Sequence, residues 1–179
     1  MCASVLESTD DLLRRAASGD QPAFEALVGP HLQLAYRLAL TMLGDPAAAE
    51  DAVQEATFRT WRHVGRLRPG SSVRAWFLTV VANHCRSQLR SRWWRVLRGL
   101  EQTESSVAMD VDPASLDLER ALLALDERDR AAIFLRYCED LPLADVAAAL
   151  GITMTAARSR IHRALRRLRL QLDDEELRG

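Results

Sequence analysis

The sequence predicts an all-α protein made of two small helical modules joined by a flexible linker. Apolar residues recur at helical spacing along nearly the whole chain, alternating strand patterns are missing, and the periodicity fails in one internal stretch rich in Gly, Ser, Asp and Pro. The chain has 179 residues, 48% of them apolar, which is enough for a packed core. We expect five segments: an N-terminal tail (1–9), a first module (10–94), the linker (95–115), a second module (116–172) and an acidic C-terminal tail (173–179).

Helix start and stop signals divide the first module. Ser8 or Thr9 is a suitable cap for the first helix, because a side-chain oxygen can accept the free N–H groups there. Pro30 predicts a kink or an interruption in the second stretch. Asp45 followed by Pro46 is typical of a helix start. The expected elements are a helix ending at residue 17, a helical stretch over 22–43, helices over 47–63 and 73–92, and a loop over 65–72.

The second module ends in a helix-turn-helix pattern. A short amphipathic helix over 143–150 stops at Gly151, which tolerates the positive φ of a tight turn. Thr153 can then cap a longer helix over 154–170. Helices over 116–125 and 127–138 precede this pair, and the apolar face of the last helix is expected to carry Ala157, Ile161, Ala164, Leu165 and Leu168.

The formal net charge of −1 conceals a sorting of charge along the chain. Residues 58–100 hold 10 Arg and residues 151–172 hold 6 Arg, and neither block contains Asp or Glu. A GC-rich coding bias would explain why all 24 basic residues are Arg, but it does not explain the exclusion of acidic residues. The pattern therefore favours two surfaces that bind a polyanion, separated by acidic stretches.

Composition also disfavours several classes of protein. No run approaches the ~20 apolar residues that a membrane span needs, and the acidic N-terminus lacks the basic start of a signal peptide. We therefore expect a soluble, cytoplasmic protein without membrane insertion. Cys2, Cys85 and Cys138 are far apart, and no Cys/His spacing suits zinc, so we expect no metal and no cofactor. Cys85 and Cys138 are expected to be buried.

The outer face of the helix over 154–170 is polar and rich in arginine. A recognition helix in a DNA major groove needs this combination, with Arg binding guanine edges or phosphates and Ser or Thr binding phosphate or base. The alternative is a helical hairpin with a solvated charged face, but such faces usually alternate in sign. The candidate DNA-binding residues are Thr155, Arg158, Ser159, His162, Arg163 and Arg166.

A second basic face lies on the helix over 73–92 and the loop before it. Asn is suited to reading a base, Arg binds phosphate, and Trp76 either stacks on an unpaired base or belongs to the core. The loop is either part of a single-strand pocket or a solvated turn. The candidate nucleic-acid residues are Arg66, Arg68, Trp76, Asn83, Arg86 and Arg90.

The helix over 47–63 differs in chemistry from both basic faces. An acidic run over 50–55 is followed by aromatic residues, which makes a poor DNA surface but a suitable surface for docking a protein. The candidate docking residues are Asp51, Gln54, Glu55 and Phe58.

Taken in order, these motifs resemble the sigma factors of bacterial RNA polymerase. The segments similar to region two are Gly44-Asp45, Glu50–Glu55, Trp61-Arg62, Arg74–Phe77 and Ala82-Asn83. The segments similar to region four are Leu125–Arg130, Leu150–Ile152 and Arg158–Ala164. The bare two-module layout over residues 10–172 resembles the small extracytoplasmic-function (ECF) sigma factors.

The resemblance implies a promoter-specificity subunit that has no catalytic residues and directs promoter-specific transcription initiation. The acidic helix would dock on the β′ clamp helices of the polymerase core, with the β flap as a further contact. The loop over 65–72 and Asn83 would capture flipped, single-stranded bases of the minus-ten element, and the last helix would read the minus-thirty-five element as duplex DNA. The linker would thread towards the active-site channel and the RNA exit path. An anti-sigma partner is implied, with Trp93 and Trp94 as candidate contacts.

The sequence departs from the family pattern at three places. Thr79 stands where a basic residue is common, Ser87 where Asp is common, and Met-Thr-Ala-Ala over 154–157 replaces the usual acidic-Gly-Thr-Val. These departures leave the promoter sequence open. A further hypothesis is that the linker discourages DNA binding by the free protein through its acidic residues Glu101, Glu104, Asp110 and Asp112.

Two alternatives use fewer of these features. A stand-alone helix-turn-helix regulator that never joins polymerase leaves the acidic run and the first basic face without a role. A nucleic-acid enzyme needs a carboxylate or histidine cluster, and Asp51 with Glu55 alone does not provide one.

Overall fold

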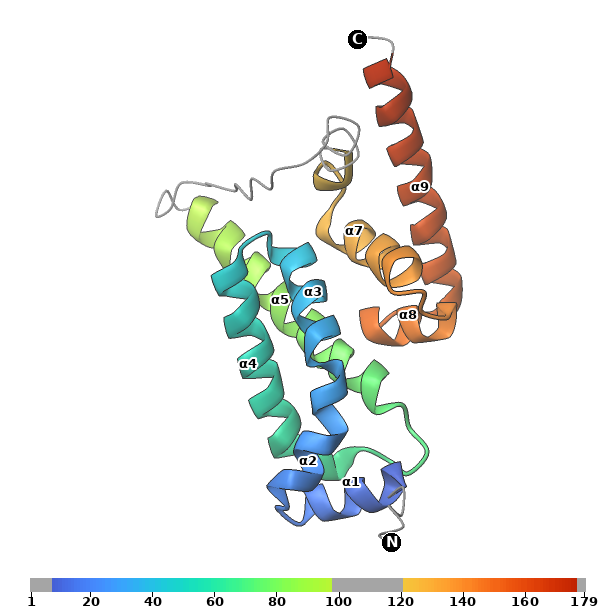
Figure 1. Cartoon of the computed structure of the whole chain (residues 1–179). Helices are drawn as coiled ribbons and strands as arrows, with labels where there is room; N and C mark the ends of the chain where they lie inside the picture. The colour runs from blue at the N-terminus through green and yellow to red at the C-terminus, as the bar shows by residue number, and fades with distance from the viewer. Residues whose placement is uncertain (1–7, 98–120, 177–179) are drawn as a thin grey trace, which may run out of the picture.

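The computed structural model describes residues 8–97 and 121–176, and all regular structure within these two ranges is helical (Figure 1). The predicted all-α fold is therefore confirmed for the described residues. The helices are α1 (Thr9–Ala17), α2 (Gln21–Val28), α3 (Leu32–Leu43), α4 (Pro46–His63), α5 (Val73–Leu97), α7 (Glu127–Ile133), α8 (Leu143–Leu150) and α9 (Met154–Glu176). Two 3-10 turns, η1 (Gly29–His31) and η2 (Val64–Arg66), and a π-helical turn, η3 (Phe134–Cys138), complete the regular structure.

The local start and stop signals act as predicted. Ser8 and Asp45 cap α1 and α4 as predicted, through side-chain oxygens that accept backbone N–H groups of the first turn, and Asp20, which was not predicted as a cap, does the same for α2. Pro30 lies in η1, which separates α2 from α3 and so produces the predicted interruption. Gly44 ends α3 with a φ of 68°, a left-handed conformation that glycine adopts without strain.

Four expectations are corrected. The helix predicted to end at residue 92 continues to Leu97, and the one predicted to end at 170 continues to Glu176. Cys138 is exposed, because it is the last residue of the π-helical turn, whereas Cys85 is buried as predicted. Leu165 is 36% exposed, because one residue of helical rotation carries it away from the inner side that Ala164 occupies.

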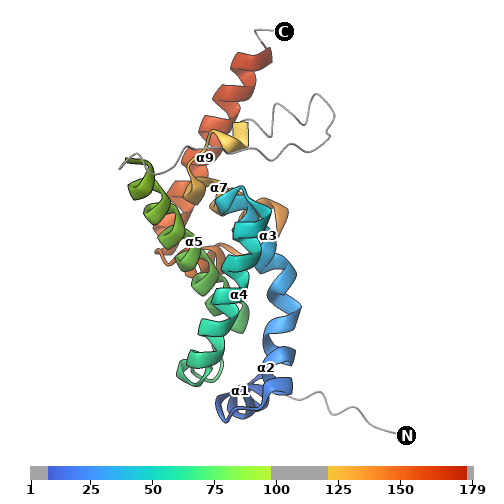
Figure 2. The same cartoon turned by 90° about the vertical axis from the view of Figure 1, so that its left-hand side faces the viewer.

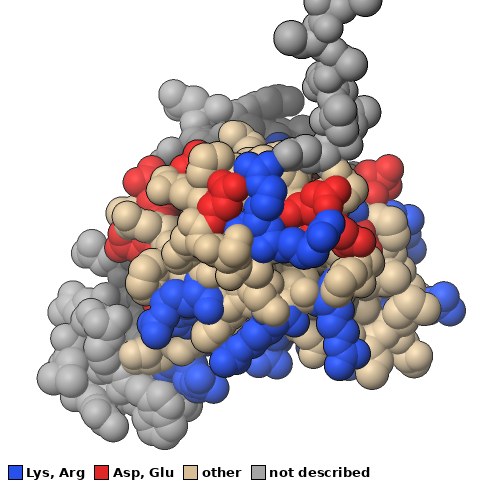
Figure 3. Space-filling view, turned by 90° about the horizontal axis from the view of Figure 1, so that it is seen from below, with Lys and Arg blue, Asp and Glu red and all other residues tan. Residues whose placement is uncertain are grey.

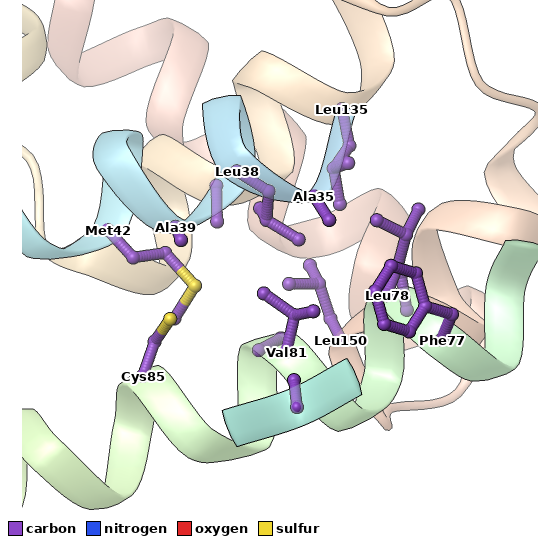
Figure 4. Packing of buried hydrophobic residues seen from close by; sticks show 14 of the residues in the cluster. Ala35, Leu38, Ala39, Met42, Phe77, Leu78, Val81, Cys85, Leu135 and Leu150 are labelled. Atoms are coloured by element: carbon purple, nitrogen blue, oxygen red, sulfur yellow. The ribbon is translucent and has the colours of Figure 1, made fainter. Parts of the chain in front are cut away.

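The core is built around α5, which packs against α3, α4 and α8 (Figure 1). Phe77, Leu78 and Val81 are fully buried along one side of α5. Figure 4 shows them facing Leu38 of α3 and Leu150 of α8, so the apolar cluster crosses from the first module into the second. The packing of α3 against α7 adds a second contact between the modules.

The turned view places α4 and α5 in front, with α7 and α8 on the far side (Figure 2). α4 and α8 therefore lie on opposite sides of the α3–α5 pair in both views. Within the described ranges, no helix is long and apolar enough to cross a membrane. The linker acids, Cys2 and the side chains of Trp93 and Trp94 lie outside the described residues, as do most of the expected linker and N-terminal tail.

Candidate functional site

α8 and α9 form the predicted helix-turn-helix. Gly151 ends α8 with a φ of 64°, and the Thr153 hydroxyl caps α9 by accepting the Ala156 N–H at 3.2 Å. The buried side of α9 carries Ala157 and Ile161. All six residues predicted to bind DNA on this helix are exposed on its outer side: Thr155, Arg158, Ser159, His162, Arg163 and Arg166.

Two further arginines of α9 bind the scaffold: the side chain of Arg160 is 19% exposed, and that of Arg167 is 58% exposed but reaches the same carboxylate. Arg160 Nη1 lies 2.7 Å from Asp129 Oδ1, and Arg167 Nη1 lies 3.2 Å from Asp129 Oδ2. Asp126, which caps α7, lies 3.6 Å from Arg160. Burial raises the pKa of the Asp129 carboxyl and Asp126 adds to the rise, while the two guanidinium groups oppose it. This network joins α7 to α9 and fixes which side of α9 faces solvent.

The basic face predicted on α5 is only partly open. Arg86 donates through Nη1 to the Leu150 carbonyl at 2.8 Å and through Nη2 to the Asn83 side-chain oxygen. Partial burial lowers the pKa of Arg86. Arg90 is exposed, and Trp76 is half-buried outside the apolar cluster rather than within it. The structure therefore brings Asn83 and Arg86 together and places Arg86 against α8.

The loop before α5 presents Arg66 and Arg68 to solvent. Asp10 ties this loop to α1, because its Oδ1 accepts the Gly70 N–H at 3.1 Å. Figure 3 shows the end of the molecule that carries α1. Arginine side chains cover the lower half of this view without acidic neighbours, whereas acidic and arginine side chains lie side by side in the upper half. One part of this end is thus a suitable surface for a polyanion.

An apolar groove of 660 Å³ runs between α4 and the α2–α3 segment. Phe24 and Trp61 line it as an edge-to-face pair with ring centroids 5.0 Å apart. Leu32 and Phe58 line it while remaining 40% and 55% exposed. Large apolar side chains left open in a concave surface are typical of sites that bind a protein or another ligand.

The predicted docking residues divide between the groove and its flank. Gln54 and Phe58 line the groove, whereas Asp51 and Glu55 lie on the adjoining side of α4, where Glu55 pairs with Arg59 at 2.7 Å. Glu50, the first residue of the predicted docking run, also lines the groove, whereas sequence reasoning missed Leu32 and Tyr36. The apolar Leu32, two residues after Pro30, is the sequence signal available for the α3 side of the groove.

The chain matches two family models, Sigma-70 region 2 over residues 27–95 and Sigma-70 region 4 over residues 115–168. It is also 34% identical over 169 residues to the ECF RNA polymerase sigma factor SigL of Mycobacterium tuberculosis, a match that covers 89% of this chain and 94% of the relative. The chain belongs to the ECF sigma factors of RNA polymerase.

Two solved structures resemble this ECF sigma factor. One is the sigma factor RpoE of Bartonella quintana in complex with the anti-sigma factor NepR, with a TM-score of 0.73, 27% identity, and coverage of 84% of this chain and 96% of that one. The other is CnrH in complex with the cytosolic domain of CnrY, with a TM-score of 0.69, 27% identity, and coverage of 93% and 99%.

Membership of the family settles the class of function. An ECF sigma factor is a non-enzymatic subunit of RNA polymerase that directs transcription initiation. The stand-alone regulator and the nucleic-acid enzyme are therefore excluded. In the described part of the sigma factor, no group of three or more His, Cys, Asp or Glu side chains is placed to hold a metal ion.

Proposed function

We propose that three separate surfaces of the sigma factor bind the polymerase core and the two promoter elements. The groove between α4 and the α2–α3 segment docks the polymerase core, the outer side of α9 reads the minus-thirty-five element, and α5 with its preceding loop captures the minus-ten element. The observation that carries this proposal is the division of arginines on α9: the largely buried Arg160 binds Asp129, whereas Arg158, Arg163 and Arg166 face solvent. A helix with a merely solvated surface has no need of this division.

For the polymerase core we propose the β′ clamp helices as the partner of the groove. Phe58 and Leu32 supply exposed apolar surface, and the acidic flank formed by Asp51 and Glu55 adds a charged rim. An apolar centre beside a charged rim is the usual build of a protein interface. The β flap is proposed as a second contact, reached by the module that carries α7, α8 and α9.

For promoter DNA we propose two forms of recognition. Arg158, Ser159, His162 and Arg163 lie on one exposed side of α9 and suit the edges and phosphates of a major groove. Arg66, Arg68, Asn83, Arg86 and Arg90, with the half-buried Trp76, suit the phosphates and unstacked bases of a single strand.

An anti-sigma factor is a further proposed partner. NepR and the cytosolic domain of CnrY bind the two sigma factors that this chain resembles in fold. Because RNA polymerase works in the bacterial cytoplasm, we place the protein there.

Run-off transcription tests the proposal. Purified core polymerase, with and without this protein, is supplied with a library of promoter fragments, and the expected result is transcripts from a small subset that depend on the protein. Glu55→Arg should weaken core binding while sparing upstream duplex binding, and equal loss of both would indicate misfolding instead. A folded protein that gives no promoter-selective transcript would contradict the proposal.

A further inference from the structure

We infer that the free sigma factor folds back on itself, so that the end of α8 occupies part of the minus-ten face of α5 while the minus-thirty-five face and the polymerase groove stay open. This inference rests on the minus-ten role proposed above for α5. It assigns the α5 face a second partner, which is the other module of the same chain.

The contact is made by the C-terminal end of α8. The last carbonyls of a helix lack intrahelical partners and carry partial negative charge. Arg86 donates to the Leu150 carbonyl at 2.8 Å. The Thr79 hydroxyl lies 2.7 Å from the carbonyls of both Ala75 and Ala148, and its single proton is shared between them. α5 therefore supplies donors to two carbonyls at the end of α8.

The turn at Gly151 lies beside Arg86. A Cβ on Gly151 would lie 3.8 Å from Arg86 Nη2, so the turn after α8 sits directly over the guanidinium group. Arg86 also donates through Nε to the Ala82 carbonyl at 3.1 Å and through Nη2 to Asn83. All three guanidinium nitrogens are thus bonded to protein acceptors, and the end of α8 stands where a phosphate would bind.

Other contacts hold the two modules in this arrangement. Arg37 of α3 lies 2.8 Å from Glu139, which follows η3, and Arg74 of α5 pairs with Asp145 of α8. Leu150 is 4% exposed and packs within the shared apolar cluster (Figure 4). The interface thus combines apolar burial with ion pairs between two modules that are far apart in the sequence.

α8 covers part of the minus-ten face and leaves the other two proposed surfaces open. All six candidate residues on α9 remain exposed, and the groove that contains Phe58 lies across the α3–α5 pair from α8 (Figure 1). Polymerase can therefore reach its groove while the modules are closed. Access of a single strand to Arg86 requires α8 to leave α5, so the free protein should bind upstream duplex better than minus-ten single strand.

The test compares the free full-length protein with variants that loosen the contact without altering a proposed DNA-binding residue. Glu139→Arg places two positive charges together at Arg37, and Arg37→Glu combined with Glu139→Arg restores the pair with the charges exchanged. Thr79→Val removes the hydroxyl donor at nearly constant volume. Glu25→Arg, on the exposed side of α2, is the control for the added positive charge.

Two quantities are measured for each protein: the radius of gyration by solution scattering, and the affinity for a fluorescent single strand carrying the minus-ten element of a promoter that the holoenzyme transcribes. Glu139→Arg and Thr79→Val should expand the protein and raise strand affinity by about three- to tenfold, since affinity scales with the fraction of open molecules. The exchanged pair should return to the original values, and Glu25→Arg should not expand.

The outcomes separate this inference from the proposed function. If the unaltered holoenzyme gives no promoter-selective transcript, the three surfaces assigned under the proposed function are overturned. If the holoenzyme transcribes normally but the loosened variants bind the single strand no better, whether or not they expand, masking by α8 is overturned.

Discussion

Asp129 of α7 and Arg160 of α9 form an ion pair of 2.7 Å in which the carboxylate side chain is only 5% exposed. The pair lies between the scaffold of region 4 and the inner side of its recognition helix. Burial raises the pKa of Asp129 despite two neighbouring guanidinium groups, which indicates that desolvation offsets much of the attraction. We therefore assign this pair to the orientation of α9 more than to stability.

Asp129→Asn is expected to reduce affinity for upstream duplex more than it reduces stability. The amide keeps the shape of the side chain, and Asp126 remains 3.6 Å from Arg160, so the loss in the free energy of unfolding should be about 1–2 kcal/mol. Denaturant unfolding and duplex titration measure the two quantities. Asp140→Asn, at a side chain that is 96% exposed, is the control and should change neither. A variant that loses stability but keeps its duplex affinity would contradict the assignment.

Arg158→Ala is expected to weaken DNA binding without lowering the stability of the protein. Arg158 is exposed on the outer side of α9, so its removal should leave stability unchanged and cost about 1–3 kcal/mol of binding at the minus-thirty-five element if the contact is bidentate to guanine. Arg169→Ala removes the same charge from an exposed position further along the helix and provides the comparison. Equal losses for both variants would indicate general electrostatic attraction instead of base reading.

The two described cysteines should differ sharply in reactivity. Burial raises the pKa of the Cys85 thiol to about 12, whereas Cys138 is exposed. Because the thiolate is the reactive form, an alkylating reagent at neutral pH should modify Cys138 in the native protein and Cys85 only after unfolding. Peptide mass spectrometry after timed alkylation distinguishes the sites. Native modification of both thiols at similar rates would show that Cys85 is accessible.

The same shift gives a pH dependence of stability. The folded-state pKa of Cys85 is higher than the value of 9.0 for an unperturbed thiol, so the folded protein holds this proton more tightly than the unfolded chain does. The stabilising contribution is complete below pH 9 and is lost as the pH rises towards 12. In Cys85→Ala, the free energy of unfolding should therefore fall less steeply with pH above pH 9 than in the unaltered protein. The cavity left by the thiol lowers the stability of the variant by the same amount at every pH. Denaturant titrations at several pH values measure both effects.

Elements of this fold that depend on short-range signals could be predicted from the sequence. The aspartate cap before Pro46, the left-handed Gly44 and the break at Pro30 each depend on residues within one helical turn, and the structure has all three. The exposed side of α9 could also be predicted, because helical periodicity alone separates Arg158 from Ile161.

Long-range partnerships could not be predicted in the same way. The carbonyl acceptor of Arg86 lies 64 residues along the chain, and nothing in the local pattern of α5 marks it. Arg160 belongs to the same acid-free block as Arg158, yet only the position of Asp129 on α7 shows that it faces inward. Residue type predicts that these arginines bind negatively charged or polar acceptors. Only the packing of the helices shows whether the acceptor is a group of the protein or lies outside it.

Leu32 gives the sharpest test of the polymerase groove, because it lies on α3, opposite the acidic helix. The side chain is 40% exposed and lines the groove together with Phe58. Leu32→Asp should leave folding nearly intact and weaken binding of core polymerase by about 1–3 kcal/mol, since a charge in an apolar contact must be desolvated without a partner. Glu25→Ala, on the exposed side of α2 outside the groove, should bind core polymerase normally.

Core affinity is measured by competition with a labelled sigma factor, and upstream duplex binding by free protein serves as the test of folding. If Leu32→Asp binds core polymerase as tightly as the unaltered protein, the groove is not the docking surface, and the charged flank of α4 around Asp51 and Glu55 must then carry the contact alone.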